Sequence, residues 1–260
     1  MEMPNAKVAV DELEGRHAVV TGGSRGLGLG IVEALVVRKV RVTVVARDAG
    51  RLAEVARRLG VATIAGDVAD PLLARNVLRE VRPSVLVLNA GASPALGTLD
   101  QLTWEEFEKP WQTDVKAAFH WVKESIALPL PRGSRVILGS SGAAVNGSPL
   151  SGGYAGAKRM VWLLAQYANA AIAGRELGVR FQAIVPMQIM GDTELGRAAA
   201  EAYAKRKGVP VEAFLAGFGS EQLTARKVGE HVVEILTDPK YAAGVTFGLK
   251  GAAGIVGLDG

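Results

Sequence analysis

Cysteine is absent from this chain of 260 residues, which excludes disulfide bonds and thiolate metal sites. A reducing cytoplasm is compatible with that absence, and we expect a cytoplasmic protein. Long hydrophobic runs are missing as well. The most apolar stretch, residues 31–46, contains four charged side chains, whereas a transmembrane helix needs about 20 nearly uncharged residues. Residues 1–14 lack the apolar centre of a signal peptide and are expected to form a short tail.

Charge of one sign is not concentrated in the sequence either. The formal net charge is +4, and the basic residues are scattered, with one run of three at Lys205, Arg206 and Lys207. Such a run is more typical of a solvated helix face than of a nucleic-acid surface. We therefore expect neither a nucleic acid nor a membrane among the partners.

Apolar residues make up 49% of the chain and no linker-like stretch divides it, so one domain is expected over residues 15–260. Short apolar runs alternate with segments of helical period. The expected strands cover residues 17–21, 41–46, 61–65, 85–88, 135–138, 179–185 and 245–249. This order predicts a single-domain α/β fold with a seven-stranded parallel sheet and helices on both faces. Ligands bind beyond the carboxyl ends of the strands in such sheets.

The expected helices include one that Asp48 caps and Gly60 ends, and a long stretch over residues 101–128 that is broken near Pro110. The other expected helices cover residues 31–37, 71–80, 151–176 and 221–236. Loops that follow the strands are therefore the places to look for a site.

A glycine-rich turn, residues 21–28, joins the first expected strand to the first helix. Gly22, Gly26 and Gly28 allow the backbone to turn sharply and to approach a pyrophosphate, which the unpaired N–H groups of the helix N-terminus attract. A glycine-rich turn without a ligand is the alternative. The strand before the turn and the helix after it favour a phosphate site.

The end of the second expected strand bears on the choice of nucleotide. An NAD site places an acidic residue there for the ribose hydroxyls, but this chain has Arg47, with Asp48 one position later. Arg25 lies in the glycine turn, and two guanidinium groups suit a 2′-phosphate. The alternative is that Arg47 is merely exposed and that Asp48 only caps its helix. We favour NADP(H) as the cofactor.

Tyr154 and Lys158 stand four residues apart in an expected helix and therefore share a face. A nearby ammonium favours the phenolate, which makes tyrosine usable as an acid or base for interconverting an alcohol and a ketone. Ser141 follows the fifth expected strand, where its hydroxyl can hold the substrate oxygen. A Tyr-x-x-x-Lys pair alone is more often only a surface pair, and its place after the strand that carries Ser141 gives it weight.

These motifs resemble those of the short-chain dehydrogenase/reductase family, in the type with a TGxxxGxG turn and a YxxxK pair. The matching residues are Thr21 to Gly28, Asp67, Val68, Asn89, Ala90, Gly91, Ser140, Ser141, Tyr154 to Lys158, and Pro186. The resemblance implies a Rossmann fold and hydride transfer between a nicotinamide and a substrate carbon, without a metal.

The resemblance also implies the role of each residue. Tyr154 would donate or accept the hydroxyl proton, and Lys158 would bind the nicotinamide ribose. Asp67 and Val68 would contact adenine, and Ile189 would lie near the nicotinamide carboxamide. The implied cofactor-binding residues are Gly22, Ser24, Arg25, Gly26, Leu27, Gly28, Arg47, Asp67, Val68, Asn89, Ala90, Gly91, Tyr154, Lys158, Pro186 and Ile189.

Three positions depart from the family pattern. Asp114 stands where the family usually has an asparagine that helps to place a water in a proton relay to the lysine. An ionised Asp114 adds a negative charge near Lys158, so Asp114 is a candidate catalytic residue whose relay is altered or weakened. Met187 replaces a common glycine, and Gly191 replaces a threonine. Thr193, two positions later, would reach the cofactor through a shifted loop.

Residues 187–219 form an insertion typical of a substrate lid, and we call this segment the lid. Its apolar side chains, such as Phe214 and Phe218, would cover a hydrophobic substrate and exclude water. An ordinary helix pair packed on the sheet is the alternative. In the resembled family, helices with surplus apolar residues pair between subunits. Trp121 and Trp162 are examples here, and a homodimer or homotetramer is implied.

The leading interpretation is an NADP(H)-dependent oxidoreductase that interconverts a ketone or aldehyde and an alcohol, with Tyr154 as acid and base. A nucleotide-binding regulator on the same fold, with weakened chemistry, is the second, and Asp114 is the observation that supports it. A different reductase, such as an enoyl reductase, would require a different spacing between the tyrosine and the lysine.

Overall fold

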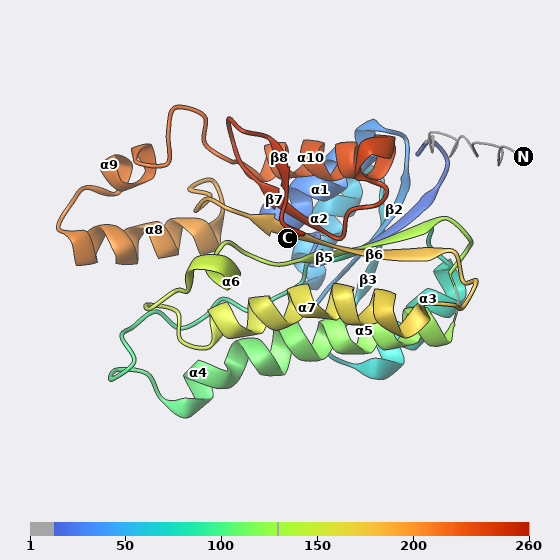
Figure 1. Ribbon diagram of the computed structural model, residues 1–260, viewed down its shortest axis with the longest axis horizontal. Coiled ribbons are helices and arrows are strands. Elements are labelled where there is room, and N and C mark those ends of the chain that lie inside the picture. The colour runs from blue at the N-terminus through green and yellow to red at the C-terminus, as the bar shows by residue number, and fades with distance from the viewer. Residues whose placement is uncertain (1–12, 129, 260) are drawn as a thin grey trace, which may run out of the picture.

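The computed structural model describes residues 13–128 and 130–259. The tail expected over residues 1–14 therefore lies almost entirely outside the described residues. The described chain forms one sheet with helices on both of its faces (Figure 1). The prediction of a single-domain α/β fold is confirmed.

The sheet has eight strands in the order β3-β2-β1-β4-β5-β6-β7-β8. Their bounds are β1 His17–Thr21, β2 Arg41–Ala46, β3 Ala62–Ala65, β4 Val85–Leu88, β5 Ser134–Gly139, β6 Val179–Pro186, β7 Thr246–Leu249 and β8 Ile255–Gly257. Strands β1 to β7 pair in parallel, whereas β8 runs antiparallel to β7. The predicted count of seven strands in a wholly parallel sheet was wrong, because β8 is too short and too glycine-flanked to have an apolar pattern of its own.

Helices pack on the sheet in two layers (Figure 1). One layer holds α1 Gly26–Val37, α2 Ala49–Leu59 and α10 Ala225–Thr237, and the other holds α3 Pro71–Val81, α5 Lys116–Ala127 and α7 Tyr154–Ile172. The remaining elements are α4 Trp104–Pro110, the π-helix η1 Trp111–Val115, α6 Ala143–Asn146, α8 Glu194–Lys207, α9 Val211–Ala216 and the short 3₁₀ helix η2 Pro239–Tyr241. Helices α8 and α9 extend beyond the carboxyl ends of the strands, where the lid was expected.

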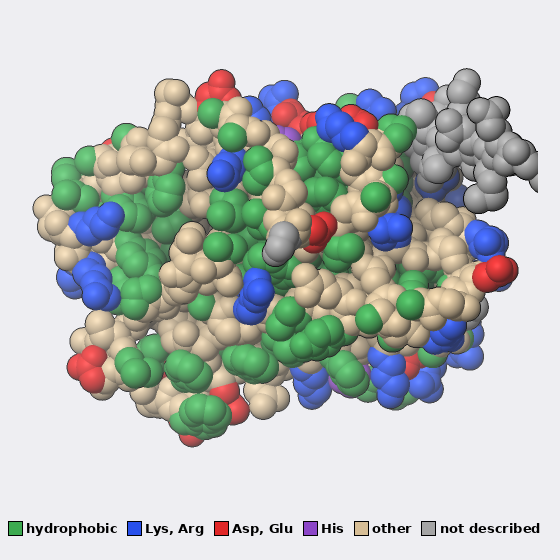
Figure 2. Space-filling model, viewed as in Figure 1, with side chains coloured by type: hydrophobic (Ala, Val, Ile, Leu, Met, Phe, Trp, Pro, Cys, Tyr) green, Lys and Arg blue, Asp and Glu red, His purple; other side chains and the backbone are tan. Residues whose placement is uncertain are grey.

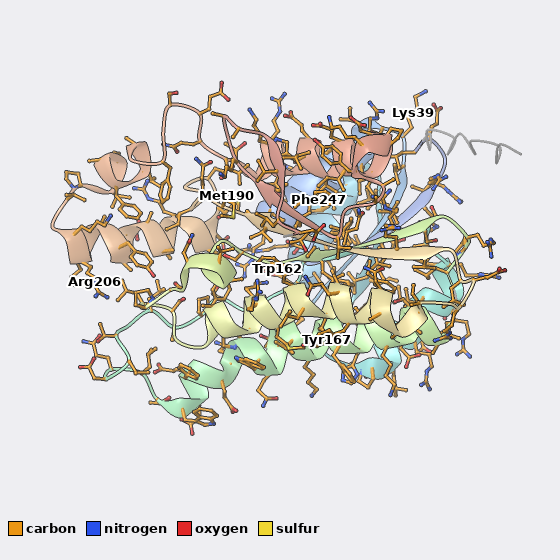
Figure 3. The ribbon with its side chains drawn as sticks, viewed as in Figure 1. Lys39, Trp162, Tyr167, Met190, Arg206 and Phe247 are labelled. Carbon is orange, nitrogen blue, oxygen red and sulfur yellow. The ribbon has the colours of Figure 1, made fainter. Side chains whose placement is uncertain are left out.

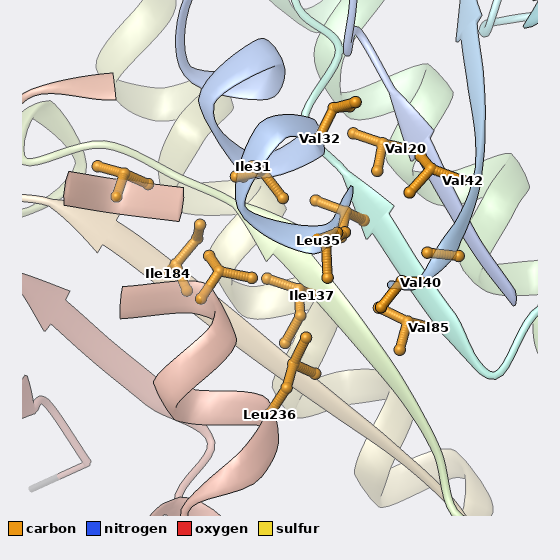
Figure 4. Packing of buried hydrophobic residues seen from close by; sticks show 14 of the residues in the cluster. Val20, Ile31, Val32, Leu35, Val40, Val42, Val85, Ile137, Ile184 and Leu236 are labelled. Atoms are coloured by element: carbon orange, nitrogen blue, oxygen red, sulfur yellow. The ribbon is translucent and has the colours of Figure 1, made fainter. Parts of the chain in front are cut away.

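The core between α1, α10 and the sheet explains why these segments fold where they do. Ile31 and Leu35, one turn apart on α1, face the sheet and are fully buried (Figure 4). They pack in one cluster with strand residues such as Ile137 and Ile184, and with Leu236 from α10. This rigid layer fixes the glycine turn that precedes α1.

The predicted start and end of helix α2 are confirmed. The Asp48 side chain accepts a hydrogen bond from the Arg51 backbone N–H (3.0 Å), and Gly60 ends the helix with a left-handed φ of 66°. The break expected near Pro110 is a change of helix type, because the chain continues from α4 into η1 and then α5. A π-turn of this kind often marks a functional site, and η1 contains Asp114.

The two tryptophans that were expected at a subunit interface are buried in the interior of this protein. Trp121 is fully buried, and the indole of Trp162 is buried and donates to Thr246 Oγ1 (2.7 Å). Phe119 and Tyr167 are instead exposed aromatic side chains on α5 and α7, and Figure 3 labels Tyr167 on α7. Helical period alone did not separate the inward face from the outward one on these highly apolar helices.

Candidate active site

A cavity of about 980 Å³ lies at the carboxyl ends of the parallel strands. Its wall is made by the loops that follow β1 to β6 and by the lid helices. Met190 lies where the chain leaves the sheet for α8, and Arg206 lies at the far end of that helix (Figure 3). Hydrophobic side chains gather on the α8 and α9 region at the left of the molecule (Figure 2).

Nearly all of the predicted site residues line this cavity. They are Gly22, Ser24, Arg25, Gly26, Leu27, Arg47, Asp67, Val68, Asn89, Ala90, Gly91, Asp114, Ser141, Tyr154, Lys158, Pro186 and Ile189. Gly28 is the exception: it is buried behind the turn, where a Cβ atom would meet the Gly22 carbonyl oxygen at 2.3 Å. Gly28 therefore serves the close packing of the turn rather than the cavity wall.

The glycine turn lies against the end of β4. Gly22 has a left-handed φ of 69°, and a Cβ atom there would lie 2.7 Å from the Ala90 Cα. The Thr21 hydroxyl accepts hydrogen bonds from the backbone N–H groups of Asn89 (3.1 Å) and Ala90 (3.2 Å). These contacts hold the ends of β1 and β4 together, and the turn lines the cavity at the N-terminus of α1.

A buried ion pair between Lys158 and Asp114 lines the cavity. Lys158 Nζ lies 3.0 Å from Asp114 Oδ2 and also donates to the Gly139 carbonyl (3.3 Å). Asp114 Oδ1 accepts from the Ala92 backbone N–H (2.7 Å) and from the Thr113 hydroxyl (2.8 Å). Burial alone would lower the pKa of Lys158, but the charges of Asp114 and Tyr154 oppose it and hold that pKa above its ordinary value.

Tyr154 and Ser141 reach the same cavity from α7 and from the end of β5. The Lys158 ammonium lies 5.7 Å from the centre of the Tyr154 ring. Ser141 Oγ accepts from the Ala143 backbone N–H (3.2 Å) in the first turn of α6, which orients the hydroxyl. The neighbouring Ser140 hydroxyl is buried and donates to the Lys158 carbonyl (2.8 Å), so it ties α7 to β5.

The end of the cavity beside Arg47 and Asp67 holds a cluster of charges that includes two residues not predicted from the sequence. Glu194, the first residue of α8, pairs with both Arg25 and Arg51. The Arg51 guanidinium also lies 3.6 Å from Asp48 Oδ2. Arg51 lies in the first turn of the expected helix that follows Arg47, and this place next to the second strand could have marked it as a site residue. No sequence signal placed Glu194 here.

The lid adds a polar edge to its apolar lining. The Tyr203 hydroxyl lies 2.9 Å from Ser148 Oγ, and Ser151 Oγ donates to Ser148 Oγ (2.6 Å). The Tyr203 ring stacks on Phe214, with ring centres 6.2 Å apart. Thr193 caps α8 by accepting from the Gly196 N–H (3.0 Å), and it lines the cavity close to the glycine turn.

Two features are absent from residues 13–128 and 130–259. Within them, no group of three or more His, Asp or Glu side chains is arranged to hold a metal ion. No helix in the same ranges combines the length and apolar content that a membrane span requires.

Solved structures with the same fold are known. An L-sorbose reductase from Gluconobacter frateurii, complexed with NADPH and L-sorbose, aligns with a TM-score of 0.76 over 93% of this chain and 98% of its own, at 22% identity. A short chain dehydrogenase from Burkholderia cenocepacia J2315, in complex with NADP, aligns with a TM-score of 0.73 over 92% and 97%, at 26% identity.

Sequence relatives point to the same group of proteins. An uncharacterised oxidoreductase of Escherichia coli K12, YghA, is 28% identical over 249 residues, which cover 85% of this chain and 83% of the relative. A family model described as short chain dehydrogenase matches residues 16–204. Since that match spans most of the chain and includes the glycine turn, Tyr154 and Lys158, the protein belongs to the short chain dehydrogenase family of oxidoreductases.

Proposed function

We propose that the protein is an NADP(H)-dependent oxidoreductase that interconverts a ketone or aldehyde and an alcohol. The observation that carries this proposal is the convergence of Ser141, Tyr154 and Lys158 on one cavity that the glycine turn also lines. Catalysis of this kind needs an acid or base, a group that orients the carbonyl and a nucleotide site within reach of both.

The residues present fit a dinucleotide. Gly22 packs so closely against Ala90 that a side chain would not fit, and the cavity lies at the N-terminus of α1, whose first N–H groups suit a pyrophosphate. Asp67 and Val68 line the cavity beyond β3, in place for adenine, and Ile189 lines it beyond β6. When bound, the nicotinamide supplies or accepts the hydride.

Side chains of this protein transfer the hydroxyl proton and stabilise the charge that its transfer leaves. In reduction, the Tyr154 hydroxyl donates its proton to the carbonyl oxygen, and the Ser141 hydroxyl donates a hydrogen bond to the same oxygen. The Lys158 ammonium favours the phenolate that remains. Asp114 holds Lys158 by a direct ion pair, so this carboxylate acts as a positioning residue rather than as the holder of a relay water.

NADP(H) is proposed over NAD(H) because cations surround the adenine end of the cavity. Asp48, the acidic residue nearest the end of β2, is engaged as the cap of α2. The guanidinium of Arg47 lines the cavity and is ion-paired with no residue that the structure describes. The NADP complex of the Burkholderia relative supports the same choice.

Arg47→Asp should reverse the cofactor preference. Loss of a charged hydrogen bond to the 2′-phosphate removes about 1.5–3 kcal/mol, so NADPH affinity should fall about ten- to a hundredfold while NADH binding is kept. The measurement is the rise in melting temperature with each cofactor. Arg57→Asp makes the same charge change on α2 outside the cavity and should keep the preference for NADPH. Equal effects of both variants would contradict the assignment.

The substrate is proposed to be a hydrophobic carbonyl compound or alcohol. Met187, Phe214 and Phe218 line the cavity on its lid side, and closure of the lid over residues 187–219 would exclude water. The Ser148 and Tyr203 hydroxyls offer one polar contact within this lining.

The exposed Phe119 and Tyr167 on α5 and α7 support a proposed homodimer or homotetramer through these helices.

Turnover decides between the enzyme and a regulator on the same fold. The specific observation in favour of the regulator is that the Lys158 ammonium already has two partners, Asp114 and the Gly139 carbonyl. Purified protein should be given NADPH with a panel of ketones, diketones and quinones while NADPH absorbance is followed. We expect consumption with at least one class of carbonyl compound. Tight NADPH binding without turnover on any of them would support the regulator.

A further inference from the structure

Three separate segments bring opposite charges together at the adenine end of the cavity. Arg25 comes from the glycine turn, Arg51 from the first turn of α2 and Glu194 from the start of α8. Arg51 Nη1 lies 2.9 Å from Glu194 Oε1, and Arg25 Nη1 pairs with the other carboxylate oxygen, Oε2. Each oxygen of one carboxylate therefore takes one guanidinium group.

This arrangement has the geometry of an anion site. Oxyanions are recognised by guanidinium groups that approach separate oxygens, and a phosphate monoester offers three such oxygens with a larger negative charge than a carboxylate. Arg47, which lies between the end of β2 and the cap of α2, lines the same cavity. Arg25, Arg47 and Arg51 would then surround the same anion.

The Glu194 carboxylate is held in a way that permits exchange. Its side chain is 61% exposed, and those of Arg25 and Arg51 are 49% and 40% exposed. Exposed ion pairs are individually weak, so a stronger anion can replace this one. The hydrogen bond from Arg51 and the charges of both arginines hold the pKa of Glu194 below its ordinary value, as expected for an ionised carboxylate between two cations.

We propose that Arg51 is a third cation of the 2′-phosphate site and that Glu194 is an internal anion that occupies this site until the 2′-phosphate displaces it. The inference rests on the proposed NADP(H) dependence. NADH has hydroxyl groups in place of the phosphate and leaves the Glu194 pairs intact. Glu194 therefore lowers the affinity for NADP(H) and leaves that for NAD(H) unchanged, which makes it a determinant of cofactor specificity contributed by the lid.

Glu194→Gln tests the displacement directly. Removal of the competing charge should tighten NADPH about three- to tenfold, because it frees two exposed pairs that are each weak. NADH affinity should stay unchanged. Titration calorimetry with NADPH, NADH and adenosine 2′,5′-bisphosphate measures this, and the last probe lacks the nicotinamide and so reports on the site without turnover. Glu201→Gln is the matched control, since Glu201 lies on the same helix, pairs with Arg197 and lies outside the cavity lining.

Arg51→Gln supplies the second arm. It should weaken NADPH and adenosine 2′,5′-bisphosphate about tenfold, which corresponds to one charged hydrogen bond, and spare NADH. In the Arg51→Gln background, Glu194→Gln should gain less than it does alone, because one of its two pairs is already gone. Weaker or unchanged NADPH binding in Glu194→Gln would overturn the proposal, as would an equal gain for NADH.

The outcome is separable from that of the proposed function. If no carbonyl compound is turned over, the proposed enzyme fails, but the bisphosphate titrations still test Glu194 and Arg51. If Arg47→Asp leaves the preference for NADPH intact while Glu194→Gln tightens NADPH alone, Arg47 is misassigned and the displacement stands.

Discussion

Tyr154→Phe should reduce turnover by about 10²- to 10⁴-fold, the usual contribution of a positioned general acid or base. The phenyl ring keeps the shape of the side chain at the start of α7 and removes only the hydroxyl that carries the proton. Affinity for NADPH should change little, because Lys158 remains paired with Asp114 and Gly139. The measurements are the steady-state rate with a carbonyl substrate and a separate NADPH titration.

Tyr167→Phe is the matched control for this prediction. Tyr167 lies on the same helix, is 55% exposed and is not among the residues that line the cavity. Its hydroxyl should be dispensable for turnover. A Tyr154→Phe variant that retains the rate of the unmodified protein would exclude the phenol as the proton donor, and the Ser141 hydroxyl would then be the group to test.

Asp114→Ala should lower the free energy of unfolding by about 3–5 kcal/mol, the usual result of removing one partner of a buried ion pair. The variant leaves the Lys158 ammonium buried beside a carbonyl alone, and it removes the acceptor of the Ala92 N–H. Asp114→Asn keeps a side-chain oxygen for Ala92, so its loss should be smaller. Urea unfolding of the unmodified protein, Asp114→Ala and Asp114→Asn measures these free energies, with the midpoint and the slope of each transition fitted together.

A double variant shows how much of the loss belongs to the pair. Lys158→Met in the Asp114→Ala background removes the stranded charge and should recover part of the stability, so the two changes should not add. Similar stability of Asp114→Ala and the unmodified protein would contradict a buried pair at this position.

The pH dependence of the Asp114 effect has a definite sign. Because the pKa of Lys158 is held above its ordinary value of 10.5, the pair contributes its full stability below that pH and loses it as Lys158 deprotonates at higher pH. In Asp114→Ala burial lowers the pKa of Lys158, so the difference in stability from the unmodified protein should be largest near neutral pH and should shrink as the pH rises toward 10.5.

Patterns that act over a few residues could be interpreted from the sequence. The β-branched runs of β1, β2 and β4, the cap at Asp48 and the left-handed stop at Gly60 depend only on local backbone chemistry. The order of these elements was enough for the α/β fold, since alternating strands and helices form a parallel sheet. The glycine turn and the pair of Tyr154 and Lys158 could be predicted because their function requires particular residue types at a fixed spacing.

Contacts between segments far apart in the chain were decided by the tertiary structure. Glu194 follows Arg25 by 169 residues, and only the path of the lid brings its carboxylate to the adenine end of the cavity. The direct pairing of Asp114 with Lys158 likewise depends on the π-turn of η1 and on the crossing of α7. Motifs and their order predicted the family, the fold class and the residues proposed for the cofactor and the chemistry. Which charges meet in the cavity depends on the folded chain, because charge pairing depends on distances that no local pattern encodes.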